Sequence, residues 1–239
     1  MTDNSMLPVI AAVVGARDER ELLASMKLAG RAMGYDQVLF GIQMHLPGVG
    51  ALQHIASGYP EAYQKLYLDR AFLGRDPTVA HCQASAHALE WSEQLYNEHS
   101  RELLEESRAH GLAHGISIPV HENAHVKSML SLGRDKPFES PAERAQVMEA
   151  ASVLANCVHV AGAKLIVPHL LAQRRPHLSP REKECFQLVA AGKSNWDMGR
   201  ILGISEAAVA FHVKNVLKKL QVSTRMQAVA IGVALGMID

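Results

Sequence analysis

Near the start of the chain, hydrophobic and polar residues follow two different periodicities. In residues 17–33 apolar side chains recur every three or four positions, which predicts an amphipathic helix that Gly34 ends. Its expected buried side consists of Leu22, Leu23, Met26, Ala29 and Met33. Residues 37–44 and 51–57 predict two strands, and Pro47-Gly48 predicts a turn.

Two more helices are predicted in the segment that follows. Pro60 suits the first turn of a helix that extends to about Arg70. Asp76-Pro77 interrupts the regular structure, because the residue before a proline avoids helical backbone angles. The pattern of residues 93–110 predicts the second helix, which Gly111 ends.

A hairpin and a long helix complete this part of the chain. Two apolar runs, residues 115–120 and 126–132, flank the polar segment 121–125 and predict a β-hairpin. Pro141 begins a predicted helix that reaches about Leu165. Its expected buried face consists of Val147, Ala151, Leu154 and Val158. Because hairpin-connected strands are interleaved with helices, we expect an α+β domain whose antiparallel sheet is covered by helices.

The length and the pattern together predict two domains. A chain of 239 residues suits one large domain or two smaller ones. Residues 167–177 contain two prolines and the pair Arg174-Arg175, so we interpret them as a linker. Residues 1–166 then form the α+β domain. Residues 178–239, helical by pattern throughout, form an all-α domain.

Cysteine usage and hydropathy indicate the compartment. Cys82, Cys157 and Cys185 have neither metal-type nor redox-type spacing, so a reducing cytoplasm is expected. The apolar stretch at residues 228–238 is far shorter than the roughly 20 residues that span a bilayer. The apolar residues 6–16 follow no Lys or Arg, so neither a membrane span nor a secretory signal is expected.

Charge is distributed unevenly along the chain, although the formal net charge is zero. Residues 1–173 carry 14 Lys and Arg against 19 Asp and Glu, a net charge of −5. Residues 174–239 carry 10 against 5, a net charge of +5. A basic module joined to an acidic one suggests that the C-terminal part binds a polyanion, although an accidental surface charge gives the same numbers.

The C-terminal residues have the pattern of a helix-turn-helix. A first helix begins at the N-cap Ser179, and Glu182 three residues later completes a capping box. A second helix covers residues 194–202, Gly203 supplies a tight turn, and a third helix covers residues 206–220. Two short helices joined by a glycine-containing turn are typical of DNA-binding helix-turn-helix proteins.

The third helix has one apolar face and one face suited to DNA. At 100° per residue the apolar face consists of Val209, Val213, Val216, Leu217 and Leu220. On the opposite face, Lys214 and Lys218 can contact phosphates or guanine, and Asn215 can pair with adenine. Phe211 there suits a thymine methyl group. The alternative is a three-helix scaffold with a solvated lysine face.

These residues resemble a known DNA-binding family. The DNA-binding domain of LuxR-type transcription regulators is similar to the run LSPREKECFQLVAAGKSNWDMGRILGISEAAVAFHVKNVLKKLQV. Glu182 and Gly192 stand at signature positions, and Phe186 stands where the family usually has leucine. The resemblance implies DNA contacts by Lys193, Ser205, Ala210, Phe211, Lys214, Asn215 and Lys218. Ala210 departs from the family, because it has no hydrogen-bonding group to read a base.

The N-terminal domain lacks the acidic cluster and late lysine of a phosphate-accepting receiver. It resembles instead the autoinducer-binding domain of quorum-sensing LuxR proteins. The resemblance is carried by Tyr59, Tyr67, Asp76-Pro77, Trp91, Gly115 and the stretch SMLSL at residues 128–132. It implies an α-β-α sandwich around a five-stranded antiparallel sheet, with an N-acyl homoserine lactone held between the sheet and one helix layer.

The residue chemistry suits such a ligand, which has an amide, two carbonyls and an apolar tail. Asp76 can accept from the amide N–H, while Tyr59 and Ser131 can donate to the acyl carbonyl. Trp91 offers a flat wall to the lactone ring, and Tyr67 joins the expected site. Space for the tail is expected beside Leu39, Gly41, Val79 and Leu130.

One expected ligand residue departs from the family. Tyr63 stands where the family usually has a tryptophan that donates to the lactone carbonyl, and a phenol differs in reach and direction. A regulator that binds another small molecule, or none, is therefore a second interpretation. Each residue also has a structural alternative: buried aromatic rings are commonly core residues, and Asp76 before Pro77 can simply cap a helix.

A third interpretation comes from the segment HENAH. It matches the zinc-hydrolase motif H-E-x-x-H, in which His121 and His125 would bind the metal and Glu122 would act as general base. The motif requires a helix, whereas the flanking runs predict a hairpin. We therefore expect no catalytic residues, no metal and no cofactor besides the small-molecule ligand.

The partners expected of such a regulator follow from its two domains. We expect a homodimer formed through the helices at residues 141–165 and 225–236. Two recognition helices would then bind a near-palindromic operator with half-sites about one helical turn apart. RNA polymerase is a further expected partner, and no membrane is expected.

Overall fold

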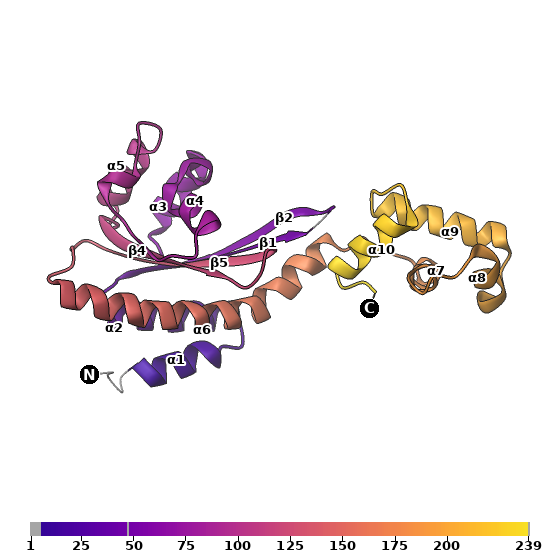
Figure 1. The fold of residues 1–239 in the computed structure, drawn as a ribbon, viewed down its shortest axis with the longest axis horizontal. Coiled ribbons are helices and arrows are strands. Elements are labelled where there is room, and N and C mark those ends of the chain that lie inside the picture. Colours follow the sequence, from indigo (N-terminus) through magenta and orange to yellow (C-terminus); the bar gives the residue numbers. More distant parts are fainter. Residues whose placement is uncertain (1–5, 47, 239) are drawn as a thin grey trace. The chain divides into compact units, whose positions relative to one another are not determined.

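The computed structural model describes residues 6–46 and 48–238, which belong to two compact units. The first unit comprises residues 1–44 and 53–167, and the second comprises residues 45–52 and 168–239. In the first unit a sheet lies between two layers of helices, as Figure 1 shows. The predicted α+β class and the α-β-α arrangement are confirmed.

The sheet has five strands in the order β2-β1-β5-β4-β3. The strands are β1 (Gln37–Leu46), β2 (Gly50–Ser57), β3 (Leu89–Glu90), β4 (His114–His121) and β5 (Val126–Arg134). Pairing is antiparallel between β1 and β5, between β4 and β5, and between β3 and β4. The register places Ser131 of β5 opposite Leu39 on one side and Ser117 on the other. The hairpin predicted around residues 121–125 is confirmed. Pro47 of the predicted turn lies outside the described residues.

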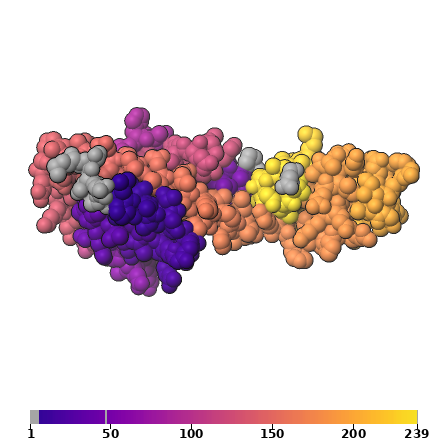
Figure 2. Space-filling model, turned by 90° about the horizontal axis from the view of Figure 1, so that it is seen from below, coloured from indigo at the N-terminus to yellow at the C-terminus, as the bar shows by residue number. Residues whose placement is uncertain are grey.

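Helices cover both faces of this sheet (Figure 1). One layer contains α2 (Glu19–Ala32) and α6 (Pro141–Arg174), with α1 (Met6–Val14) packed outside α2. The indigo N-terminal helices lie at the surface in Figure 2. The opposite layer contains α3 (Glu61–Asp69), α4 (Pro77–Ala84) and α5 (Arg101–Ala109). The second layer is short and irregular, and this leaves space against the sheet.

Close packing fixes α6 on the sheet. A Cβ added at Gly162 would lie 2.4 Å from the Phe40 ring of β1, so only glycine permits this approach. The predicted face of α6 is buried, with Ala151 and Leu154 fully inaccessible. By length and composition α6 passes for a membrane-spanning helix, but 44% of its most apolar window is buried inside the protein. That burial is typical of a helix packed on a core.

Several boundaries differ from the sequence prediction. The α6 helix continues past Leu165 to Arg174 and contains Pro168, so much of the expected linker is helical. The predicted helix at residues 93–110 is instead a short 3₁₀ turn (Glu93–Leu95) followed by α5. Asn97 Oδ1 accepts hydrogen bonds from the backbone N–H groups of His99 and Ser100, and this local turn competes with helix formation.

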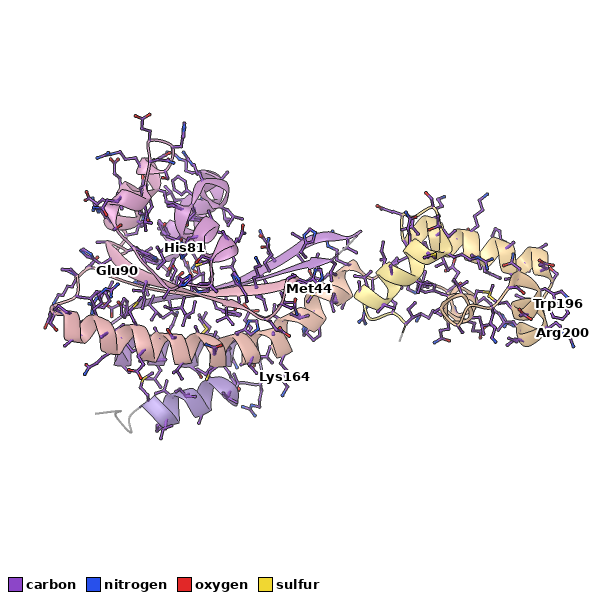
Figure 3. The ribbon with its side chains drawn as sticks, viewed as in Figure 1. Met44, His81, Glu90, Lys164, Trp196 and Arg200 are labelled. Carbon is purple, nitrogen blue, oxygen red and sulfur yellow. The ribbon has the colours of Figure 1, made fainter. Side chains whose placement is uncertain are left out.

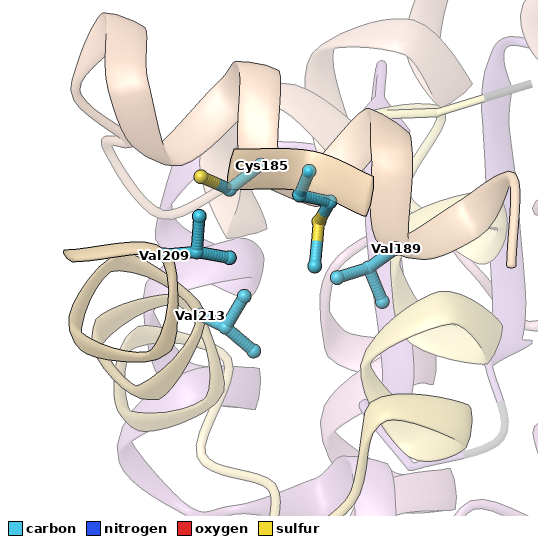
Figure 4. Close-up of a cluster of buried hydrophobic side chains, with 5 residues drawn as sticks. Cys185, Val189, Val209 and Val213 are labelled. Atoms are coloured by element: carbon cyan, nitrogen blue, oxygen red, sulfur yellow. The ribbon is translucent and has the colours of Figure 1, made fainter. Parts of the chain in front are cut away.

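The second unit is the predicted helical domain. Its helices are α7 (Pro180–Ala190), α8 (Asn195–Leu202), α9 (Glu206–Lys219) and α10 (Arg225–Ala234). The capping box of Ser179 and Glu182 is present, and Gly203 ends α8 with a φ of 65°. Figure 4 shows the core that joins α7, α8 and α9. It consists of Cys185, Val189, Met198, Val209 and Val213.

Candidate ligand-binding site and DNA interface

A cavity of about 290 Å³ lies between the sheet and the helices α3, α4 and α5. The six sequence-predicted ligand residues all line it, although they come from five different segments. They are Tyr59, Tyr63, Tyr67, Asp76, Trp91 and Ser131. The fold therefore brings the predicted residues to one partly open space whose surface is mostly apolar, which is the usual composition of a small-molecule site.

Asp76 both caps α4 and lines the cavity. Its Oδ1 accepts from the Thr78 N–H at 2.8 Å and from the Thr78 hydroxyl at 2.7 Å. Its Oδ2 accepts from the Tyr67 hydroxyl at 2.8 Å. Burial, followed by the negative charge of Asp76, raises the pKa of Tyr67, so this phenol keeps its proton. A carboxylate has about four acceptor positions, so Asp76 can accept one more hydrogen bond from a ligand.

Trp91 is held flat against the sheet by a glycine and a serine. A Cβ at Gly115 would lie 2.4 Å from the Trp91 ring and 2.6 Å from the Leu132 carbonyl oxygen. The Trp91 indole N–H donates to Ser117 Oγ at 2.9 Å, and Ser117 Oγ lies 2.8 Å from Ser131 Oγ. Gly115 thus makes room for the ring, and the serine pair fixes its orientation.

The three tyrosines form one side of the cavity. The ring centroids of Tyr59 and Tyr63 are 6.1 Å apart, and those of Tyr63 and Tyr67 are 6.0 Å apart. Burial raises the pKa of Tyr59 well above its ordinary value. The Tyr63 hydroxyl lies 2.8 Å from Ser107 Oγ, and Ser107 donates to the Leu103 carbonyl at 2.7 Å.

The apolar part of the cavity is only partly as predicted. Leu39, Gly41 and Val79 line it, but Leu130 does not and is buried on the other face of the sheet. Successive strand residues point to opposite faces, so Ser131 in the cavity excludes Leu130 from it. Met129 takes the position expected for Leu130.

Further lining residues were missed by the sequence prediction. They include Thr78, Cys82, Tyr96, Leu103, Ser107 and Met129. For Met129 a signal existed, because it lies two residues from Ser131, and residues two apart on a strand point to the same face. Tyr96 and Ser107 come from the segment whose helix was misplaced, and its pattern contains no comparable signal.

The rival zinc motif lies in the hairpin turn rather than on a helix. The Nε2 atom of His121 lies 2.7 Å from the Cys82 carbonyl oxygen, and Glu122 lies 3.3 Å from His159 Nε2. Without a helix, His121 and His125 do not share a helical face. Among residues 6–46 and 48–238 no group of three His, Cys, Asp or Glu side chains is arranged to hold a metal ion.

On α9, the predicted recognition residues lie opposite the core. Ala210, Phe211, Lys214 and Lys218 are exposed, Phe211 with 61% of its surface accessible, and Asn215 is half-buried. Ser205 caps the helix by accepting from the Ala208 N–H at 3.1 Å, and Lys193 is exposed in the loop before α8. Figure 3 shows Trp196 and Arg200 on α8, where the guanidinium lies 4.9 Å from the ring centroid.

Glu182 holds this unit together from inside. It is 4% exposed, and its Oε2 accepts from the Ser179 N–H at 2.7 Å and from Lys219 Nζ at 2.6 Å. Burial alone would raise the pKa of Glu182, but the hydrogen bonds from Lys219 and Ser179 outweigh it and lower that pKa. The capping box thus connects the start of α7 to the end of α9.

A mostly apolar cavity in one unit and a helix-turn-helix in the other define a ligand-binding transcription regulator. The comparisons with known proteins agree with that class. The profile of the autoinducer binding domain matches residues 18–161, and that of bacterial regulatory proteins of the luxR family matches residues 176–231. The chain belongs to the LuxR family of quorum-sensing transcription regulators.

Individual relatives match along almost their whole length. The transcriptional activator SolR of Ralstonia nicotianae is 31% identical over 93% of this chain and 94% of its own. The quorum-sensing regulator RhlR of Pseudomonas aeruginosa is 29% identical over 92% and 91%. The crystal structure of Escherichia coli SdiA is 25% identical, with a TM-score of 0.68, covering 98% of this chain and 96% of that one. SdiA with octanoyl-rac-glycerol has a TM-score of 0.66 at 25% identity, covering 100% and 99%.

Proposed function

We propose that the cavity binds an N-acyl homoserine lactone, or an acyl ligand of closely similar shape, and that this ligand controls DNA binding by α9. The observation that carries the proposal is the position of Asp76, a carboxylate with spare acceptor capacity inside a mostly apolar cavity. The structure of SdiA in complex with octanoyl-rac-glycerol supports an acyl ligand in this fold.

Each lining residue has a role in this proposal. Asp76 accepts the ligand's amide N–H, and Tyr59 and Ser131 donate to its acyl carbonyl. Trp91 covers the head group, while Tyr63 and Tyr67 enclose it. Along β5 the four residue steps from Ser131 to Lys127 span about 13 Å, which gives room for a tail of medium length.

The second part of the proposal concerns DNA and assembly. The contacts come from the exposed face of α9 and its flanks: Lys193, Ser205, Ala210, Phe211, Lys214, Asn215 and Lys218. A homodimer formed through α6 and α10 binds a near-palindromic operator and, as a regulator rather than an enzyme, acts with RNA polymerase in the bacterial cytoplasm. Because the side chain of Ala210 is nonpolar, DNA recognition at this position relies on DNA shape or on an apolar contact.

Thermal melting tests the ligand proposal. Protein produced in cells that make no acyl homoserine lactone is melted with a panel of these lactones of increasing acyl length. A ligand at 100 times its Kd stabilises the fold by about 2.7 kcal/mol, which raises Tm by roughly 5–10 °C in a chain of this size.

The variant Asp76→Asn should lose this rise, because an amide presents both a donor and an acceptor where the ligand needs an acceptor. Asp69→Asn is the matched control, since Asp69 is an exposed carboxylate on α3 that does not line the cavity. If no lactone shifts a folded wild-type protein, the lactone assignment fails, and another acyl ligand or ligand-independent DNA binding replaces it.

A further inference from the structure

The Tyr63 hydroxyl at the cavity wall already donates its proton in a hydrogen bond within the protein. Ser107 Oγ donates its only proton to the Leu103 carbonyl oxygen at 2.7 Å. The 2.8 Å bond between Ser107 and Tyr63 therefore has Tyr63 as its donor. Both side chains line the cavity, and both are 5% exposed. Towards a ligand, the Tyr63 oxygen presents lone pairs and no proton.

The neighbouring hydrogen-bond donors also donate to partners within the protein. Tyr67 donates to Asp76 at 2.8 Å, and the Trp91 indole N–H donates to Ser117 at 2.9 Å. The Asp76 carboxylate adds only acceptors. The side of the cavity formed by Tyr63, Tyr67 and Asp76 is therefore rich in acceptors and poor in donors.

A ligand carbonyl placed against Tyr63 meets an oxygen lone pair. Turning the hydroxyl towards that carbonyl would break the bond to Ser107 and leave a buried serine oxygen without a donor. Losing a buried partner is costly, because water does not replace it. A ligand hydroxyl at the same place donates to Tyr63 without disturbing Ser107.

We propose that Ser107 is a specificity-determining residue, which acts through Tyr63 to select acyl ligands whose head group carries a hydrogen-bond donor next to this phenol. This inference rests on the proposed function, since it concerns the head group of a ligand in the same cavity. Among the acyl ligands of the proposed function, it favours those with a hydroxyl-bearing head over homoserine lactones, whose ring carries a carbonyl and no hydroxyl.

A matched pair of ligands tests the inference. N-octanoyl-2-aminocyclopentanol and N-octanoyl-2-aminocyclopentanone share a tail and an amide, and differ in a ring hydroxyl against a ring carbonyl. Their Kd values for the full-length protein are measured by calorimetry. Wild type should bind the alcohol about tenfold more tightly, the ratio that one unmade buried hydrogen bond produces.

The variant Ser107→Ala should reverse or abolish that preference, because the Tyr63 proton is then free to donate to the ketone. Ser152→Ala is the matched control, since Ser152 makes the same type of bond to the carbonyl four residues earlier, at 2.7 Å in α6, and does not line the cavity. If Ser107→Ala does not fold, Tyr63→Phe provides the same test and should bring the two Kd values together.

The inference is overturned if wild type binds the ketone as tightly as the alcohol, or if the ratio is unchanged in Ser107→Ala or Tyr63→Phe. In both cases ligand binding itself persists and the proposed function stands. Binding of neither compound, together with no Tm shift from any lactone, overturns the proposed function and this inference with it.

Discussion

Gly115 occupies a position that no larger side chain fills without moving its neighbours. An alanine there would bring a Cβ within 2.4 Å of Trp91 and 2.6 Å of the Leu132 carbonyl oxygen, and the backbone oxygen cannot rotate away. We expect Gly115→Ala to destabilise the protein by roughly 1–3 kcal/mol, as overpacking does, and to weaken ligand-induced stabilisation. Chemical denaturation with and without ligand measures both effects.

The control for this substitution is Gly74→Ala. A Cβ at Gly74 meets no atom within 4 Å, and its backbone is not in the left-handed region. If Gly115→Ala is as stable as Gly74→Ala, the close fit of Trp91 is not what requires glycine at this position.

Lys214 lies on the exposed face of α9, four residues from Lys218. If it contacts a base, Lys214→Ala should weaken operator binding by roughly 1–3 kcal/mol and relax the sequence preference at one position. Fluorescence anisotropy with the operator and a scrambled duplex separates the two effects. Unchanged operator affinity would remove Lys214 from the recognition surface.

Residues around the cavity show both the strength and the limit of sequence reasoning. The shared order of Tyr59, Asp76 and Trp91 led to one cavity, although each alone suggested only a core or capping residue. Leu130 was misplaced because its apolar character suits either face of the sheet. Alternation along the strand places it on the face opposite to its neighbour Ser131, and the register, which puts Ser131 opposite Leu39, agrees.

At the scale of elements, long periodic helices were predicted and short irregular ones were not. The helices α7 to α9 were placed by caps and glycines that act locally. The α4 helix has eight residues and the β3 strand two, too few to establish a period. The end of α6 was placed too early, because nothing local marks how far a helix tolerates an internal Pro168.

Packing between elements also explains a departure from the family. Phe186 of α7 stands where the family usually has leucine. A Cβ at Gly232 of α10 would lie 2.4 Å from the Phe186 ring, so the larger ring is accommodated by a glycine on the facing helix. The two positions compensate each other in volume, and neither is interpretable from sequence alone.

The bond between α7 and α9 at Glu182 predicts a dependence on pH. The folded-state pKa of Glu182 lies below its ordinary 4.5, so its ionised form stabilises the folded protein. That stabilisation is complete above the unfolded-state pKa and is lost as the pH falls through the folded-state value. Glu182→Gln should be less stable at neutral pH, and the difference from wild type should shrink at acid pH.

Thermal melts of the full-length protein across the acid range measure this difference. Glu184→Gln is the control, because Glu184 is a half-buried carboxylate two residues away on the same helix that pairs with Arg181 rather than with Lys219. A stability difference between wild type and Glu182→Gln that stays constant with pH would contradict the assignment.

At the scale of the whole molecule, the two parts of the chain carry net charges of opposite sign. The net charge of +5 in residues 174–239 should make DNA affinity fall steeply with salt, because each phosphate contact releases counterions. If Lys214 and Lys218 contact phosphates, replacing both with alanine should reduce the slope of log K against log salt by about 1.8.

The matched control replaces Lys65 and Lys136, exposed lysines outside the helix-turn-helix. It removes the same total charge, so it separates local phosphate contacts from the overall field. Equal changes in slope for the two double variants would show that the charge of the whole molecule, rather than α9, governs the salt dependence.

The chain has two tryptophans, and the fold gives them different surroundings. Trp91 is half-buried in the cavity wall, whereas Trp196 has 57% of its surface accessible on α8. Each unit therefore carries its own optical reporter. Replacing Trp196 with phenylalanine leaves an emission spectrum that follows only the cavity, so the filling of the sensor can be observed without any attached dye.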